Sequence, residues 1–475
     1  MNLAPEHLYQ AVVSRDHRFD GVFYVGVQST GIYCRTICPS RRPAYRHCRF
    51  FRHAVLAEVA GFRPCLRCRP EQAPGHATVD AWHRHSDRLV RVLDQGVFRD
   101  HRVPAVARLF GLSDRQFRRA TLQAYGVSPV EIAQTQRLLF AKQLLSDTAL
   151  PIGQVALASG FGSLRRFNAL FAGRYRLTPS EVRSSRRASP AGQWITCRLA
   201  YRPPFDWEGL LAFLRVRAIP RVERVTSSTY ERTAAWNGAA GLIRVSHRPE
   251  ARAVAVSVTP SLVPVLGRVV TRVRRLLDLD AHPERISQHL ADLPDYLPGT
   301  RLPGAFDAFE VSVRAILGQQ VSVRAATTLA GRLANRFGTC VNTGDEELNG
   351  TMPSASVLAV LEPGELAGLG ILPARAAAIL ALAREVASGR LVLEFSSAPI
   401  DVTLARLKML PGVGEWTAQY LAMRALHWPD AFPALDLGIR RALGNLSAAA
   451  VLQRAQFWRP WRAYAAIHLW RTSPP

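Results

Sequence analysis

The chain has 475 residues, enough for roughly three domains that each bury a core of their own. Its 61 Lys and Arg residues outnumber 36 Asp and Glu, and a net charge of +25 indicates a nucleic-acid-binding protein, although a merely basic soluble protein has the same balance. The sequence contains neither a membrane-spanning apolar stretch nor a secretion signal, so we expect a cytoplasmic protein with no membrane partner.

The first segment, to about Gly75, is rich in cysteine. Cys34-x3-Cys38 and Cys65-x2-Cys68 have the spacing of a tetrahedral four-cysteine site for one Zn²⁺ ion. The zinc could be purely structural, because so small a segment with few apolar residues needs a staple. It could equally keep a thiolate ready to accept an alkyl group, and the residue pattern leaves both open. Cys48 belongs to neither pair, and we expect a spare buried thiol.

Two stretches that contain these cysteines, Ser29–Arg42 and Ala60–Pro70, resemble the N-terminal domain of the Ada adaptive-response protein. The resemblance covers about the first 75 residues. It implies that Cys34 takes a methyl group from a DNA methylphosphotriester while it stays a zinc ligand, and that Thr30 and Arg41 contact the DNA backbone. The Pro-Cys-His-Arg tetrapeptide of the second methyltransferase domain that Ada proteins often carry is absent, so we expect no repair of O6-methylguanine. The remaining zinc ligands would be Cys38, Cys65 and Cys68.

The segment from about Thr78 to Arg187 has apolar residues at three- and four-residue spacing, which predicts an all-α domain. It contains an internal repeat, in which Tyr125–Ile132 is echoed about 50 residues later by Tyr175–Val182. Each copy contains two helices joined by a glycine turn, and the second helix begins near Ser113 or Ser163. This is helix-turn-helix anatomy, in which the second helix enters the major groove; a plain helical bundle with solvated arginines is the alternative.

The second helix of each copy carries the candidate DNA-contacting side chains. The segment resembles the AraC-type DNA-binding domain over about 80 residues, most specifically at Ser159–Gly162 and Leu177–Ser180. The resemblance implies a transcription regulator with operator DNA as a partner. The candidates are Arg115, Gln116, Arg118 and Arg119 in the first copy and Arg165, Arg166 and Asn168 in the second.

The second half of the chain follows a segment, Ser184–Gly192, that has the composition of a linker. Alternating runs such as Ala253–Val258 predict strands up to about residue 272, and the remainder is expected to be mostly helical. The expected fold is therefore multidomain. The domains would be a small α+β zinc domain at 1–76, an all-α domain at 78–187, an α/β subdomain at 193–272 and a mostly α domain at 273–475.

Two features of the last domain point to chemistry on DNA. Gly412 and Gly414 form a glycine-rich turn at the start of a helix, where backbone N–H groups can face a phosphate oxygen. Asp436 lies within Phe432–Gly438 in an apolar setting, where a carboxylate is costly unless it has a function. An aspartate that only caps a helix is the structural alternative.

The turn and this aspartate together are the signature of the HhH-GPD base-excision glycosylase superfamily, and residues 193–475 resemble its AlkA branch. Ala315–Ser322 and Phe457–Tyr464 carry further resemblance. It implies an enzyme that flips alkylated bases such as 3-methyladenine and 7-methylguanine out of double-stranded DNA and hydrolyses the N-glycosidic bond. Asp436 would stabilise the oxocarbenium-like sugar or orient water onto it. The family's base-pocket aromatics match Trp416, Tyr420 and Trp470, although an aromatic stripe is more often core.

Two positions refine this expectation. Gln320 stands where AlkA members have a leucine wedge that fills the gap left by the flipped base, so the wedge role is open. Trp416 stands where strand-cutting members have a lysine, which predicts a monofunctional DNA-3-methyladenine glycosylase II. We expect a monomer that combines methyl acceptor, regulator and glycosylase. The alternative is a non-catalytic DNA-binding regulator with a structural zinc.

Overall fold

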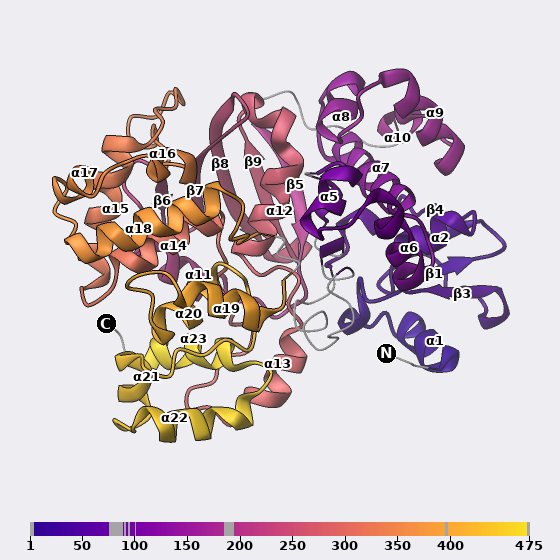
Figure 1. Ribbon diagram of the computed structural model, residues 1–475. Helices are drawn as coiled ribbons and strands as arrows, with labels where there is room; N and C mark the ends of the chain where they lie inside the picture. Colours follow the sequence, from indigo (N-terminus) through magenta and orange to yellow (C-terminus); the bar gives the residue numbers. More distant parts are fainter. Residues whose placement is uncertain are drawn as a thin grey trace. The chain divides into compact units, whose positions relative to one another are not determined.

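The computed structural model describes residues 4–75, 89, 92–93, 96–99, 101–184, 194–394 and 398–472 (Figure 1). The chain divides into two compact units. Of the described residues, unit 1 comprises those up to 203 together with 248–271, and unit 2 comprises 204–247 and those from 272 on. Apart from Ser184, the expected linker lies outside the described residues. Among the helices that the structure describes, none is long and apolar enough to cross a membrane.

The N-terminal part of unit 1 is a small α+β fold around a sheet of order β3-β1-β2-β4. β1 pairs antiparallel with β2 and β3, and β2 pairs in parallel with β4 through Tyr33 and Pro64. The next residues along these two strands are Cys34 and Cys65, so this register brings one cysteine of each pair side by side. The elements are α1 (Pro5–Val13), β1 (Tyr24–Val27), β2 (Ile32–Cys34), β3 (Cys48–Phe51), α2 (Ala54–Val59) and β4 (Arg63–Pro64), with 3-10 turns at His17–Phe19, Tyr45–His47 and Pro70–Gln72.

The middle of unit 1 confirms the two helix-turn-helix copies. Ser113 and Ser163 cap α6 and α9, because each hydroxyl accepts a hydrogen bond from the backbone N–H three residues on. Gly111 and Gly160 hold the turns with φ of 63° and 81°, which glycine adopts without strain. The helices are α5 (Val103–Leu109), α6 (Asp114–Tyr125), α7 (Pro129–Asp147), α8 (Ile152–Ala158), α9 (Leu164–Tyr175) and α10 (Pro179–Ser184), preceded by a 3-10 turn at Val97–Arg99.

The long helix α7 runs between the two copies (Figure 1). It packs against α2, α5, α6, α8 and α10, and residues along most of its length are buried. It also contacts β5 (Ile195–Ala200), which pairs antiparallel with β9 (Ala253–Val258) from Ile195 opposite Val258 to Ala200 opposite Ala253. Helix α8 packs against the 3-10 turn Pro260–Val265. Unit 1 therefore contains strands from the segment after the linker.

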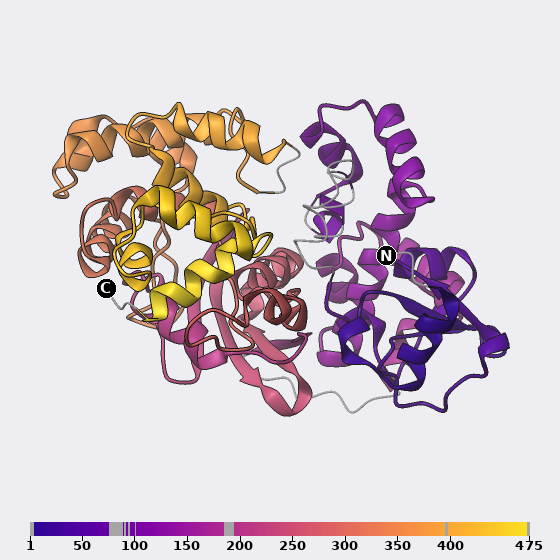
Figure 2. The same cartoon turned by 90° about the horizontal axis from the view of Figure 1, so that it is seen from below.

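Unit 2 contains an antiparallel β6-β7-β8 meander and a mostly helical body, as expected. Helices α19 and α20 flank the glycine turn and pack together, and α21 packs against α23. Figure 2 shows the C-terminal helices of unit 2, drawn in yellow, lying together. The strands are β6 (Glu223–Val225), β7 (Thr229–Trp236) and β8 (Ala239–Arg248). The helices from residue 204 on are α11 (Trp207–Arg215), α12 (Leu266–Leu276), α13 (Pro283–Leu290), α14 (Ala308–Leu317), α15 (Val323–Phe337), α16 (Ala355–Ala359), α17 (Pro363–Ala367), α18 (Pro373–Ala387), α19 (Ile400–Lys408), α20 (Glu415–Arg424), α21 (Leu437–Ala442), α22 (Ala448–Arg454) and α23 (Arg462–Thr472), with 3-10 turns at Pro249–Ala251 and Ala455–Trp458.

Candidate functional site

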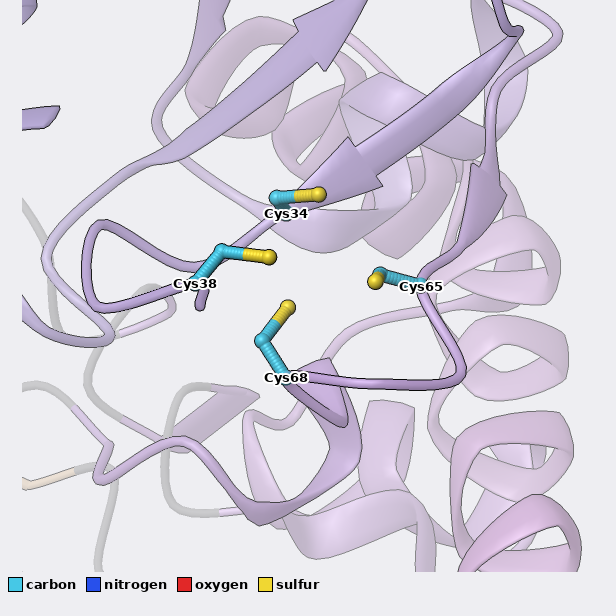
Figure 3. A group of neighbouring side chains, drawn as sticks. All are labelled: Cys34, Cys38, Cys65 and Cys68. Carbon is cyan, nitrogen blue, oxygen red and sulfur yellow. The ribbon is translucent and has the colours of Figure 1, made fainter. Parts of the chain in front are cut away.

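Unit 1 contains a four-thiol centre. The Sγ atoms of Cys34, Cys38, Cys65 and Cys68 all lie within 4.8 Å of one another, and the four side chains point toward a common centre (Figure 3). A tetrahedral zinc ion with Zn–S bonds of about 2.3 Å separates its sulfurs by about 3.8 Å. The donor set therefore fits one zinc ion, as the spacing predicts.

The four sulfurs differ in the hydrogen bonds that they receive. Cys65 Sγ accepts from the backbone N–H of Arg67 at 3.4 Å, and Cys68 Sγ from that of Arg35 at 3.3 Å. Within the described part of the chain, Cys34 and Cys38 receive no hydrogen bond from a backbone N–H. Cys48 is half-buried, and its thiol contacts the Ala44 carbonyl at 3.5 Å, so the expectation of a buried thiol was wrong.

A buried charged network joins the cysteine loop to helix α7. Lys142, on α7, donates to the backbone oxygen of Cys65 at 3.3 Å and to Glu71 at 2.6 Å. Arg69 pairs with Glu71 at 2.9 Å and with Asp147 at 2.7 Å. Burial alone would raise the pKa of Glu71, but Lys142 and Arg69 outweigh it and lower that pKa, so the carboxylate is ionised. Sequence reasoning missed this network because its members are far apart along the chain.

Glu58, on α2, forms a second buried link. Its carboxylate accepts hydrogen bonds from Thr135 of α7 at 2.7 Å, from Tyr33 of β2 at 3.1 Å and from Tyr175 of α9 at 3.2 Å. Burial raises the pKa of Glu58 to about 7 against these favourable bonds. The strand that ends at Cys34 is thus tied to the second helix of the second helix-turn-helix copy.

The candidate DNA-contacting residues of unit 1 are all exposed, as contact with DNA requires. Gln116 also caps its own helix, because its Oε1 accepts from the backbone N–H and the hydroxyl of Ser113. Contact with DNA itself stays a prediction. The set is Thr30, Arg41, Arg115, Gln116, Arg118, Arg119, Arg165, Arg166 and Asn168.

Unit 2 centres on Asp436. Its Oδ1 accepts a hydrogen bond from the N–H of Ile439 at 3.1 Å and so caps α21, as the helix-cap alternative predicted. The same carboxylate also accepts two indole N–H bonds, from Trp416 to Oδ2 and from Trp470 to Oδ1, each at 2.9 Å. The cap needs only the bond from the Ile439 N–H. Two tryptophan donors from separate helices indicate that the carboxylate is held in one orientation for a further purpose.

The expected aromatic residues come together around this carboxylate. Trp416 and Tyr420 stack with ring centroids 5.2 Å apart and planes 15° apart, and Tyr420 lies 6.1 Å from Trp470. All three rings are partly exposed. A flat base can therefore find an aromatic face next to an anchored carboxylate.

The glycine turn adjoins this cluster. Gly412 adopts φ 73° and Gly414 is the N-cap of α20, so the turn opens the helix as predicted. Gln319 donates to the Gly412 carbonyl at 2.8 Å and to the Thr417 hydroxyl at 2.9 Å. Its neighbour Gln320 is exposed, with a left-handed φ of 54°, in the turn between α14 and α15. Gln319, which sequence reasoning missed, thus connects the turn between α14 and α15 to the glycine turn.

Comparison with known proteins agrees with this arrangement. Four family models match in succession: the metal binding domain of Ada at residues 7–71, a helix-turn-helix domain at 106–185, the AlkA N-terminal domain at 196–307 and the HhH-GPD superfamily base excision DNA repair protein at 313–457. A solved 3-methyladenine DNA-glycosylase from Archaeoglobus fulgidus shares the fold, with a TM-score of 0.50 and 21% identity over 58% of this chain and 98% of that one.

Two curated relatives match more closely. The DNA-3-methyladenine glycosylase 2 of Escherichia coli is 34% identical over 58% of this chain and 96% of its own length. The probable bifunctional transcriptional activator/DNA repair enzyme AlkA of Mycobacterium tuberculosis is 39% identical over 98% of this chain and 96% of its own length. Because the match spans both units and all four family models, this chain belongs to the family of that bifunctional AlkA protein.

Proposed function

We propose that this protein excises alkylated bases, 3-methyladenine and 7-methylguanine among them, from double-stranded DNA at Asp436, and repairs DNA methylphosphotriesters at Cys34. The observation that carries the excision is the orientation of Asp436 by the indoles of Trp416 and Trp470. The four family matches and the 39% identical relative support it. The protein would act as a monomer, with the domain limits 1–76, 78–187, 193–272 and 273–475.

The excision follows from the chemistry of the cluster. An alkylated purine cation stacks against Trp416, Tyr420 and Trp470, whose ring faces attract positive charge. When the bond between C1′ and the base nitrogen breaks, the electron pair leaves with the base and the sugar becomes cationic. The Asp436 carboxylate stabilises that cation or orients the attacking water. The base departs neutral, so little acid catalysis is needed.

Replacement of the carboxylate tests the excision. Asp436→Asn keeps the cap and nearly the same shape but removes the charge and one of the two oxygens that accept indole N–H bonds. We expect the single-turnover rate of 7-methylguanine release to fall about 100-fold or more. Asp401 is an exposed carboxylate on α19, and Asp401→Asn is therefore the matched control. This variant should release 7-methylguanine at the wild-type rate. Unchanged excision in Asp436→Asn would refute the role.

The methyl acceptor is Cys34 in this proposal. A bound zinc ion keeps all four thiols as thiolates. Hydrogen bonds stabilise a thiolate and make it a weaker nucleophile, and among the described residues Cys34 and Cys38 are the two sulfurs that receive none from a backbone N–H. Of these two, Cys34 is the acceptor that the resemblance to the Ada domain implies. The Cys34 thiolate attacks the methyl carbon of the phosphotriester, and the electrons of the broken C–O bond stay on the phosphate.

Mass spectrometry of peptides from the protein incubated with methylated DNA tests this assignment. The peptide that contains Cys34 should gain one methyl group, and the gain should vanish in Cys34→Ala but persist in Cys48→Ala. A methyl group on Cys38, Cys65 or Cys68 in the wild type would show that Cys34 is not the acceptor.

Methylation would also act as a regulatory signal. Four thiolates around Zn²⁺ carry a net charge of about −2, and methylation of one removes a unit of repulsion toward phosphate. The exposed arginines of α6 and α9 would then bind operator DNA more tightly. We expect the affinity for operator DNA to rise after methylation and to fall with salt. An unchanged affinity would favour the alternative of a regulator with a purely structural zinc.

A further inference from the structure

Three arginines gather at the hydroxyl end of Tyr420. Arg424 donates to the Tyr420 hydroxyl at 3.0 Å. Arg217 and Arg314 act on the same hydroxyl through their charges. We call Arg217, Arg314 and Arg424 the arginine cluster.

No carboxylate of the described chain pairs with the arginine cluster. Glu223 and Glu310, which act on Arg314 through their charges, are bound to Arg232 at 3.6 and 2.9 Å. The cluster is held instead by neutral groups. Arg424 donates to the carbonyl oxygens of Pro303 and Gly304, Arg217 to that of Phe213, and Arg314 to the Thr327 hydroxyl, while Nη1 of Arg314 is buried without a partner.

The hydroxyl of Tyr420 responds to this charge. Burial by itself would raise the pKa of Tyr420, but Arg424, Arg217 and Arg314 outweigh burial and lower it. Arg217 and Arg424 also lie 3.8 and 4.7 Å from the ring centroid of Phe213, which stacks near Trp470. The positive charge therefore lies beside Tyr420 directly and, through Phe213, near Trp470.

Groups of opposite charge thus contact different members of the aromatic cluster. The arginine cluster lies at the Tyr420 hydroxyl, and the Asp436 carboxylate accepts from the indole N–H groups of Trp416 and Trp470. Cleavage of a glycosidic bond moves one electron pair from C1′ onto the base. Positive charge beside the base and negative charge beside the sugar both favour that movement.

We infer that the positive charge of the arginine cluster acts together with the negative charge of Asp436 to favour departure of a base that is bound against the aromatic residues. The inference rests on the proposed excision. It concerns charge placement, since none of the three guanidinium groups needs to touch the reacting atoms.

The inference has a kinetic signature for a cationic base. In the bound substrate the base carries +1 and is repelled by the cluster, whereas in the transition state this charge has largely moved to the sugar. Removal of one arginine charge should therefore strengthen substrate binding and slow bond cleavage by similar factors. A mutation that only damages the fold slows cleavage without tighter binding.

Single-turnover excision from a duplex with one 7-methylguanine measures both quantities. For Arg314→Gln and Arg217→Gln we expect the maximal rate and the half-saturating enzyme concentration each to fall about 10-fold, with their ratio constant within about 3-fold. Arg314→Met and Arg217→Met also remove the charge and should show the same paired decrease.

The outcomes are distinct. A slower rate with unchanged or weaker binding in both glutamine variants, or no change in either quantity, overturns the inference. Methionine variants that do not show the paired decrease also overturn it, because loss of the charge would then not be its cause. A wild-type protein that releases no 7-methylguanine contradicts the proposed excision instead.

Discussion

At the scale of single residues, Glu58 makes the stability of unit 1 depend on pH. Its pKa is about 7 in the folded protein against an ordinary value of 4.5, because it is buried. A raised pKa means that the folded state holds the proton more tightly, so the contribution of Glu58 to stability is greatest below pH 4.5 and is lost as the pH rises to 7. The shift corresponds to about 3 kcal/mol.

Glu58→Gln isolates this contribution, because glutamine keeps an acceptor oxygen and never ionises. We expect the free energy of unfolding of the variant, relative to the wild type, to increase by a few kcal/mol between pH 4.5 and 7. Urea denaturation at several pH values, followed through unit 1, measures it. A difference that is constant over this range would contradict the raised pKa.

The two lysines determine a second residue-scale prediction. Lys142 is buried against Glu71 in unit 1, and Lys408 pairs with Glu415 at 3.0 Å near the glycine turn. Neither occupies the position of Trp416, where strand-cutting relatives have their Schiff-base amine. Borohydride should therefore trap no covalent adduct with abasic DNA beyond background. If the wild type did give a trapped adduct and Lys408→Met gave it too, an amine other than Lys408 would form the Schiff base.

At the scale of elements, α7 connects the thiol centre to the helix-turn-helix pair. Lys142→Met leaves Glu71 with Arg69 alone in a buried setting, and loss of one partner of a buried pair costs about 3–5 kcal/mol. Lys408→Met removes the exposed pair with Glu415 and should lower the free energy of unfolding by about 1 kcal/mol or less, so it is the matched control. Equal effects of the two substitutions on thermal unfolding would show that the buried network carries no stability.

Zinc removal should spread through the same element. Because Lys142 bonds the Cys65 backbone and Glu58 bonds Thr135, loss of the metal should loosen α7 as well as the first 75 residues. Hydrogen exchange after treatment with a chelator should show faster exchange in both segments, while α20 in unit 2 stays protected. Protection of α7 that survives chelation would mean that the helix is stable without the zinc module.

At the scale of the whole molecule, the two chemistries should be separable. Cys34 lies in unit 1 and Asp436 in unit 2, each in a compact body with its own buried residues. Cys34→Ala should abolish methyl transfer and leave base excision within about 3-fold of wild type, and Asp436→Asn should do the reverse. Loss of excision in Cys34→Ala while the circular dichroism and DNA binding of unit 2 persist would join the two sites functionally.

The sequence by itself determined the parts that depend on local spacing. Two cysteine pairs predict a tetrahedral metal site, Ser113 and Ser163 predict helix starts, and Gly412 with Gly414 predicts a turn that opens a helix. Each of these signals lies within a few residues, where chain geometry limits what the backbone can do. The aromatic residues and Asp436 were also found, although their bond pattern was not.

Only the tertiary structure decided the contacts between distant residues. Glu58 meets Tyr175 across 117 positions of sequence, and Lys142 meets Glu71 across 71. The arginine cluster draws on α14, α20 and the residues after α11, and in the sequence its members are indistinguishable from the many other arginines of a strongly basic chain. Folding distinguishes them, because burial without a carboxylate partner turns an ordinary solvated charge into a strong local field.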